Sequence, residues 1–103
     1  FKIMKNISER TFILLHEADN TITALADLSM GQEIAMDADA TPASIIVKQD
    51  ISYAHKFARV PIAEGADVKK YGEVIGIATA AIQPGEHVHV HNVEGKRAQG
   101  EPS

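Results

Sequence analysis

One short pattern occurs three times along this chain and limits the folds that the chain can adopt. In each copy an Ala is followed four residues later by Ile or Leu, three later by Gly, and three later by Val or Ile. A short strand, a tight turn whose Gly takes a positive φ, and a second short strand fit this pattern. It therefore predicts a mainly β domain of folded hairpins. The copies "ALADLSMGQEI", "ARVPIAEGADV" and "ATAAIQPGEHV" begin at Ala24, Ala58 and Ala78.

Other segments predict strands around these copies. Residues 12–15 (FILL) and 44–48 (SIIVK) are apolar and β-branched, as in buried strands. Gly72 and Gly76 flank two apolar residues, which predicts a turn into a strand that closely approaches another backbone. The copies are 34 and then 20 residues apart, which is not the fixed period of a solenoid.

One stretch favours a helix. Residues 20–28 fit a short helix with Asp19 or Asn20 as its N-cap. No segment shows a sustained 3.6-residue apolar period beyond one or two turns. The expected fold class is therefore mainly β, with at most one or two short helices.

The composition excludes several classes of protein. The chain has 103 residues, enough for one modest core but short for a two-domain enzyme, so a catalytic role requires a partner surface. It has no cysteine, which excludes disulfides, thiolate metal sites and cysteine nucleophiles. Its net charge is -4 and its Lys and Arg residues are scattered, which argues against nucleic acid or an anionic membrane as a partner.

The same features predict the location and organisation of the chain. No apolar run approaches the roughly 20 residues of a membrane span, and the first ten residues lack the apolar core of a signal peptide. We therefore expect a soluble, cytoplasmic protein that can form a homo-oligomer. Residues 1–10 are expected to be a lead-in, residues 11–93 the domain, and residues 94–103 a polar tail or a linker to a further catalytic domain.

The stretch "GEHVHVHN", residues 85–92, is the first candidate site. In an extended strand successive side chains alternate between faces, so His87, His89 and His91 share one face and the two valines share the other. Neutral imidazole is a common metal ligand, and the three rings are candidate ligands for one ion. The alternative, a solvated face on which His is merely polar, stays open.

A second candidate is the pair His55 and Lys56. His55 is a candidate general acid/base or ligand, because its pKa lies where it can both take and give a proton. Lys56 is a candidate for binding a substrate carboxylate. The alternative is an exposed start of a strand.

Two further clusters follow predicted turns or strands. His16, Asp19 and Asn20 come directly after the first predicted strand, where a loop can bind an ion or a polyol, or where Asp19 or Asn20 can cap a helix. Tyr71 and Glu73 flank a Gly, so a hydroxyl and a carboxylate are available to a substrate, or the Tyr packs on the core.

The motifs taken together resemble the SAF-type domain of the altronate and galactarate dehydratase family. The resemblance covers roughly residues 11–92 and depends on the order of four motifs: His-x-x-Asp-Asn, His-Lys, Tyr-Gly-Glu-x-Ile-Gly and Gly-Glu-x-Val-His-x-His-Asn. The segment 54–92 carries three of them, and the segment 14–34 is similar to the opening of the same domain. Ala54 stands where the family commonly has Gly before His-Lys, and the spacer around residues 36–43 is longer than expected.

The resemblance implies a β-clip fold, in which bent hairpins wrap over each other, and a role in a sugar-acid hydro-lyase. In such enzymes a larger catalytic domain or subunit supplies the rest of the active site. Water is removed from an acid sugar such as altronate, giving a 2-keto-3-deoxy product, and a divalent metal ion, iron(II) or manganese(II), is implicated. The candidate residues then divide into acid/base or ligand groups (His16, His55), substrate contacts (Lys56, Asp19, Asn20, Tyr71, Glu73) and a metal face (His87, His89, His91).

Two alternatives remain at this point. One is the small subunit of a related lyase, such as one that cleaves sulfite from sulfolactate, since Lys and His suit that anionic substrate equally. The other is a non-catalytic β-clip binding module, either of an assembly chaperone or for carbohydrate. Only a panel of substrates separates the first alternative from the sugar-acid hydro-lyase. A failure to bind any metal would favour the second alternative.

Overall fold

The computed structural model describes residues 11–36 and 42–95, and within them the fold is built from strands alone. No helix that is long and apolar enough to cross a membrane occurs in this part of the chain. The mainly β prediction is confirmed. The strands are β1 (Phe12–Ile13), β2 (Thr21–Ala24), β3 (Glu33–Ala35), β4 (Ser44–Ile46), β5 (Lys56–Ala58), β6 (Asp67–Lys70), β7 (Glu73–Ala78), β8 (His87–Val88) and β9 (Val93–Gly95).

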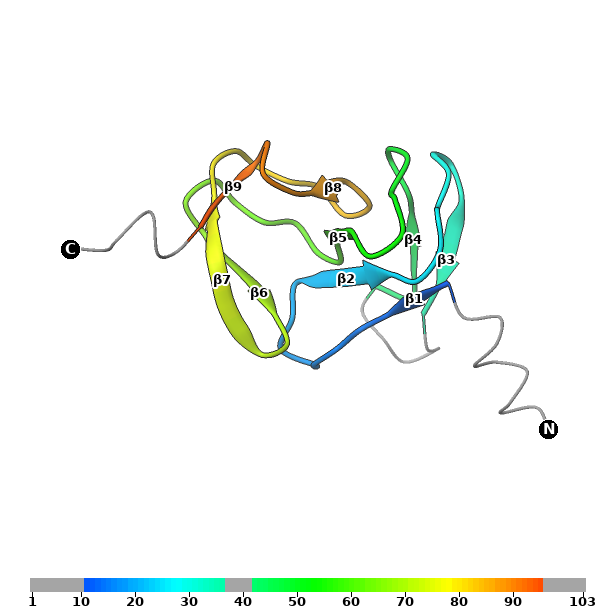
Figure 1. The fold of residues 1–103 in the computed structure, drawn as a ribbon, viewed down its shortest axis with the longest axis horizontal. Helices are drawn as coiled ribbons and strands as arrows, with labels where there is room; N and C mark the ends of the chain where they lie inside the picture. Colours follow the sequence, from blue (N-terminus) through cyan, green and yellow to red (C-terminus); the bar gives the residue numbers. More distant parts are fainter. Residues whose placement is uncertain (1–10, 37–41, 96–103) are drawn as a thin grey trace.

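The strands form three antiparallel sheets. A central sheet has the order β1-β2-β5-β8, and the β3–β4 hairpin and the sheet β6-β7-β9 lie on either side of it (Figure 1). β8 pairs with β5 alone among the described strands, so it is an edge of the central sheet. Strands of the central sheet are only two to four residues long. Such short strands need the packing of the flanking sheets to be stable.

The threefold pattern forms three equivalent turns. In each turn the N–H of the fourth residue donates to the carbonyl of the first over 3.0 Å. The donor and acceptor are Gln32 and Ser29, Ala66 and Ala63, and Glu86 and Gln83. The Gly at the third position has a φ of +88 to +92, as type II turns require. The nine apolar positions of the pattern are all buried, so they mark the core: Ala24, Leu28, Ile34, Ala58, Ile62, Val68, Ala78, Ile82 and Val88.

The two strands that flank each turn do not pair with each other, which the sequence pattern did not indicate. The strand before the second turn, β5, pairs with β2 and β8, whereas the strand after it, β6, pairs with β7. Isolated bridges join Leu28 to Ile51 and Ile62 to Ile82 across the connecting segments. Each turn therefore carries the chain from one sheet to the next, so the three sheets wrap around one another.

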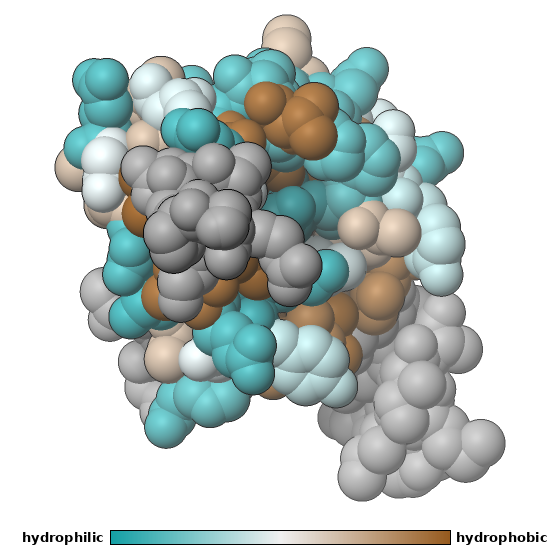
Figure 2. Space-filling view, turned by 60° about the vertical axis from the view of Figure 1, so that its left-hand side comes forward, coloured by the Kyte–Doolittle hydropathy of each residue, from teal (hydrophilic) through white to brown (hydrophobic). Residues whose placement is uncertain are grey.

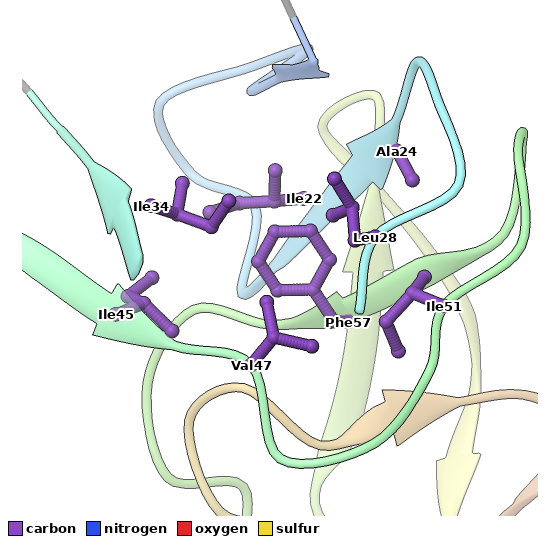
Figure 3. Close-up of a cluster of buried hydrophobic side chains, with 8 residues drawn as sticks. All are labelled: Ile22, Ala24, Leu28, Ile34, Ile45, Val47, Ile51 and Phe57. Carbon is purple, nitrogen blue, oxygen red and sulfur yellow. The ribbon is translucent and has the colours of Figure 1, made fainter. Parts of the chain in front are cut away.

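Two hydrophobic clusters lie on opposite faces of the central sheet. Phe57 lies at the centre of the first cluster, surrounded by aliphatic side chains from β2, β3, β4 and the segments beside them (Figure 3). The second cluster contains Ala58 and Val88 and includes side chains of β6 and β7. Neighbours along β5, Phe57 and Ala58, therefore belong to different clusters, as strand alternation requires.

The short helix predicted for residues 20–28 is wrong. This segment begins with β2, which pairs with β1 and β5, and continues into the first turn. Asn20 does not cap a helix, because its side chain bonds to the backbone of β6. The strand predicted between Gly72 and Gly76 is confirmed as β7, and a Cβ on Gly76 would come within 2.6 Å of the carbonyl oxygen of Glu94.

The surface that carries β6, β7 and β9 is largely polar, with hydrophobic side chains in separate patches (Figure 2). The predicted boundary after residue 93 falls inside β9, which continues to Gly95 and pairs with β7. The predicted lead-in 1–10, most of the spacer at 36–43 and residues 96–103 lie outside the described residues.

Candidate metal and substrate site

Four histidine rings gather where β5 and β8 meet. His55 Nδ1 lies 2.9 Å from His87 Nε2. The His55 and His89 rings are stacked with centroids 4.3 Å apart, and the His87 ring stacks on both at 5.0 and 5.2 Å. His91 is tilted against His87 at 5.2 Å and is exposed. We call His55, His87 and His89 the histidine triad.

The position of His55 depends on a turn with an unusual backbone. Its N–H donates to the Ser52 carbonyl over 2.9 Å, which closes a turn whose third residue is Ala54. Ala54 has a φ of +73, a conformation that residues other than Gly rarely adopt. The turn then leads directly into β5, whose pairing of Phe57 with His87 brings His55 beside β8. The strained residue therefore precedes a candidate functional group, as is common at sites.

The rings of His89 and His91 are positioned by a loop after β8 and not by the extended strand that was predicted. β8 ends at Val88, and residues 89–92 form a turn in which the Asn92 N–H donates to the His89 carbonyl over 3.1 Å. Val88 is therefore buried, whereas Val90 is 82% exposed at the tip. The shared face of His87, His89 and His91 arises from this turn and not from strand alternation.

Two amide side chains that the sequence analysis did not single out hold this loop. Buried Asn92 accepts from the His89 N–H over 2.9 Å and donates to the His87 carbonyl over 2.8 Å. Gln49 accepts from the His87 N–H over 2.8 Å. The Asn of the His-x-His-Asn motif was the available signal, whereas nothing in the sequence around Gln49 indicates this contact.

The triad fits the donor set of a divalent metal ion. Its three ligand nitrogens lie within 4.8 Å of one another, and it is the one such group of His, Asp or Glu among the described residues. Two nitrogens at about 2.1 Å from one ion lie at most about 4.2 Å apart. Small ring movements are therefore sufficient for all three to reach one ion. The predicted metal face was His87, His89 and His91. In the structure the group that could hold an ion consists of His55, His87 and His89 instead.

The electrostatics disfavour a positive charge on two of these rings, His87 and His89, and an imidazole must be uncharged to bind a metal ion. The pKa of His87 is lowered from 6.5 to about 4, first by burial and then by the charge of His55 and other basic neighbours. The pKa of His89 is also lowered, by burial and then by His55. In the His55–His87 contact one nitrogen must donate and the other accept, so this pair holds at most one positive charge.

Lys56, the first residue of β5, is partly buried. Burial lowers its pKa, and the charge of Lys70 lowers it further. The charge of Lys56 in turn contributes to the lowered pKa of His87 and His89. Lys56 therefore acts electrostatically on the triad, and its contact with a substrate carboxylate stays a prediction.

In the loop after β1, the side chains of Asp19 and Asn20 make hydrogen bonds that give these residues a structural role. Asp19 is 1% exposed, and its two oxygens accept from the N–H groups of Tyr71 and Gly72 over 2.8 and 2.7 Å. Asn20 accepts from the Lys69 N–H and donates to the Asp67 carbonyl, both over 2.8 Å. These side chains clamp the β6–β7 hairpin to the start of β2.

The remaining candidates lie at the tip of the same hairpin. Tyr71 and Gly72 both have positive φ, as in a type I′ turn, and the Tyr71 side chain is 70% exposed and does not pack on the core. Glu73 is exposed opposite Lys70. The His16 ring lies against Gly72 and accepts from the Ala18 N–H, and it is not part of the triad. Substrate contact by Tyr71 and Glu73, and an acid/base or ligand role of His16, stay predictions.

Comparison with known proteins identifies the family of this chain. Residues 10–96 match the sequence model of the altronate/galactarate dehydratase SAF domain, which is most of the chain. The chain belongs to this family. The SAF resemblance seen in the motifs is thereby confirmed.

Relatives in the family differ in how they carry this domain. The altronate dehydratase of Escherichia coli (strain K12) is 46% identical over 81 residues, and that of Bacillus subtilis (strain 168) is 41% identical over 85 residues. These matches cover 79% and 82% of this chain but only 16% of each relative. The (2R)-sulfolactate sulfo-lyase subunit alpha of Chromohalobacter salexigens is 38% identical over 89 residues, which cover 82% of this chain and 94% of that subunit. The SAF domain thus occurs as a small part of a dehydratase or as a subunit of a lyase.

Proposed function

We propose that this chain is the SAF part of a sugar-acid hydro-lyase of the altronate dehydratase type, which completes its active site with a larger catalytic domain or subunit. The observation that carries the proposal is the histidine triad, since two segments 32 residues apart converge on one point in a member of this family. The cysteine-free composition allows the cytoplasm as the compartment of this activity.

The triad is proposed to hold a divalent metal ion, iron(II) or manganese(II). Dehydration of a 2,3-dihydroxy acid removes the proton next to the carboxylate and expels the β-hydroxyl as water, and the resulting enol becomes the 2-keto-3-deoxy acid. A bound divalent ion supplies Lewis-acid stabilisation of the negative charge that develops beside the carboxylate. His55 then acts as a ligand, and Lys56 binds the substrate carboxylate.

The test measures dehydratase activity on a panel of aldonates, aldarates and sulfolactate with ferrous iron or manganese. The chain is assayed alone and together with its natural continuation or large partner. We expect activity only in the combined form, and a loss of at least about 100-fold in His55→Ala, because a ligand is removed. Val90→Ala changes an exposed side chain in the adjacent loop and is the matched control, with activity close to wild type.

A second candidate is supported by the sulfo-lyase subunit, because this chain covers 94% of it and only 16% of the dehydratases. Release of sulfite from sulfolactate and no turnover of any aldonate would favour this candidate. Equal activity of the large partner with and without this chain would contradict both candidates and favour a non-catalytic binding module.

A further inference from the structure

Asn92 lies where the chain leaves the histidine triad and enters the third sheet. The next residue, Val93, begins β9, which pairs with β7. The Asn92 carbonyl accepts from the N–H of Thr79, the residue after β7, over 2.9 Å. The backbone of Asn92 is therefore fixed to the sheet β6-β7-β9.

The Asn92 side chain turns back to two members of the triad. Its Oδ1 accepts from the His89 N–H over 2.9 Å, and its Nδ2 donates to the His87 carbonyl over 2.8 Å. The Asn92 N–H also donates to the His89 carbonyl over 3.1 Å. One residue thus contacts the backbone of His87 and His89 at three points and closes the turn 89–92.

Burial makes these amide contacts difficult to replace. Asn92 is 9% exposed, and a buried polar group that loses its partner keeps the full cost of its desolvation. Gln49 also accepts from the His87 N–H, but its side chain is exposed, so water can take its place. Of the two amides, Asn92 therefore has the stronger effect on the loop.

His89 depends on Asn92 more than His87 does. His87 is also held by the pairing of β8 with β5, whereas His89 follows the end of β8 and belongs to no strand in the part of the chain that the structure describes. Both backbone groups of His89 bond to Asn92. The stacking of the His89 ring on the His55 ring, at 4.3 Å between centroids, is therefore set by Asn92.

We propose that Asn92 is a positioning residue of the triad, whose amide fixes His89 against His55 before any ion binds. Its consequence for a metal ion rests on the proposed function, because three nitrogens already in place need no ordering of the turn when an ion arrives. Without the amide, the turn opens and His89 leaves the stack. His55 and His87 stay together through the register of β5 and β8, so two imidazole ligands remain.

The test compares Asn92→Ala with wild type in two measurements. In the metal-free chain, nuclear Overhauser contacts between the His55 and His89 rings are expected to disappear, while those between His55 and His87 persist. With manganese(II), calorimetry should show at least about a tenfold loss of affinity, and X-ray absorption two imidazoles in place of three. Gln49→Ala is expected to weaken manganese(II) binding less than Asn92→Ala and to keep three imidazoles.

Gly65→Ala separates positioning from a general loss of stability. A Cβ on Gly65 meets nothing within 4 Å, but its φ of +88 is unfavourable for Ala, so this variant should unfold at a lower urea concentration. We expect it to keep the manganese(II) affinity and the three imidazoles. Asn92→Ser has a side chain too short to reach both His87 and His89, and it takes the place of Asn92→Ala if the latter does not fold.

The inference is overturned if the Asn92 variant keeps the contacts between the His55 and His89 rings, or if Gly65→Ala loses as much affinity at an equal loss of stability. If wild type binds no metal while the ring contacts still depend on Asn92, the metal part of the proposed function falls and the positioning role stands. Saturable binding in wild type that is unchanged in the Asn92 variant removes the positioning role alone.

Discussion

At the scale of single residues, two rings of the histidine triad, His87 and His89, resist protonation. Burial disfavours a charge on His87, and each charge on a neighbouring ring disfavours the next one. The short contact between His55 and His87 adds a direct limit, because two doubly protonated rings would place two donors against each other. The lowered pKa of His87 and of His89 is therefore consistent with the proposed metal site.

This arrangement predicts a pH dependence of stability for the metal-free protein. The pKa of His87 is about 4 in the folded state against 6.5 ordinarily, so the unfolded chain binds the additional proton between these values. The free energy of unfolding should therefore fall as the pH is lowered from 6.5 towards 4. Urea unfolding in the presence of a chelator measures this free energy at each pH. His87→Gln should reduce the slope of the free energy of unfolding against pH.

The control for this measurement is His16→Gln, which changes a histidine outside the triad. It should keep the slope of the wild type. An identical slope in wild type and His87→Gln would show that the depressed pKa of His87 does not contribute to stability.

The sequence indicated some of these residues and could not indicate others. His87 and His89 were recognisable as candidate ligands because their spacing is local. The contact of His55 with them depends on the register of β5 against β8, which brings together residues 32 apart. Asp19 and Asn20 were ambiguous because carboxylate and amide groups serve equally in loops, caps and sites, and only the tertiary contacts decide.

At the scale of elements, the three type II turns are alike in backbone but differ in surroundings. A Cβ added at Gly65 meets nothing within 4 Å, whereas one at Gly85 would collide with the carbonyl oxygen of Ile46. Both glycines have a φ of +88. The third turn therefore needs Gly both for its conformation and for the close approach of the β4 backbone.

A matched pair of substitutions tests this difference. Gly65→Ala should lower the free energy of unfolding by about 1–2 kcal/mol, the cost of a left-handed conformation. Gly85→Ala should cost about 1–3 kcal/mol more, because the backbone must shift as in an overpacked core. Urea unfolding at one pH measures both. Equal losses in the two variants would contradict the close approach.

The turns could be predicted from sequence, but their partners could not. Gly at the third position and apolar residues around it are local signals, and all nine apolar positions of the pattern are buried. Which strands then pair depends on contacts between distant segments, so the flanking strands were wrongly expected to fold back on each other as hairpins. The helix expected for residues 20–28 failed for the same reason, since pairing with β1 and β5 outweighed a weak local preference.

At the scale of the whole molecule, the domain places its candidate site at an edge. The two hydrophobic clusters fill both faces of the central sheet, whereas the triad lies at β8, the edge strand, beside an exposed loop tip at Val90. The relatives carry this domain as 16% of a dehydratase or as a lyase subunit. An open edge of this kind suits a site that a larger partner completes.

The most direct test of the central claim is a titration of the purified chain with manganese(II) or iron(II) under anaerobic conditions, followed by calorimetry and X-ray absorption. The account predicts one ion per chain with three imidazole nitrogens, and at least about a tenfold loss of affinity in His55→Ala, His87→Ala and His89→Ala. His91→Ala should bind like wild type, because His91 lies outside the triad. No saturable binding, or equal losses in His91→Ala and His55→Ala, would contradict the account.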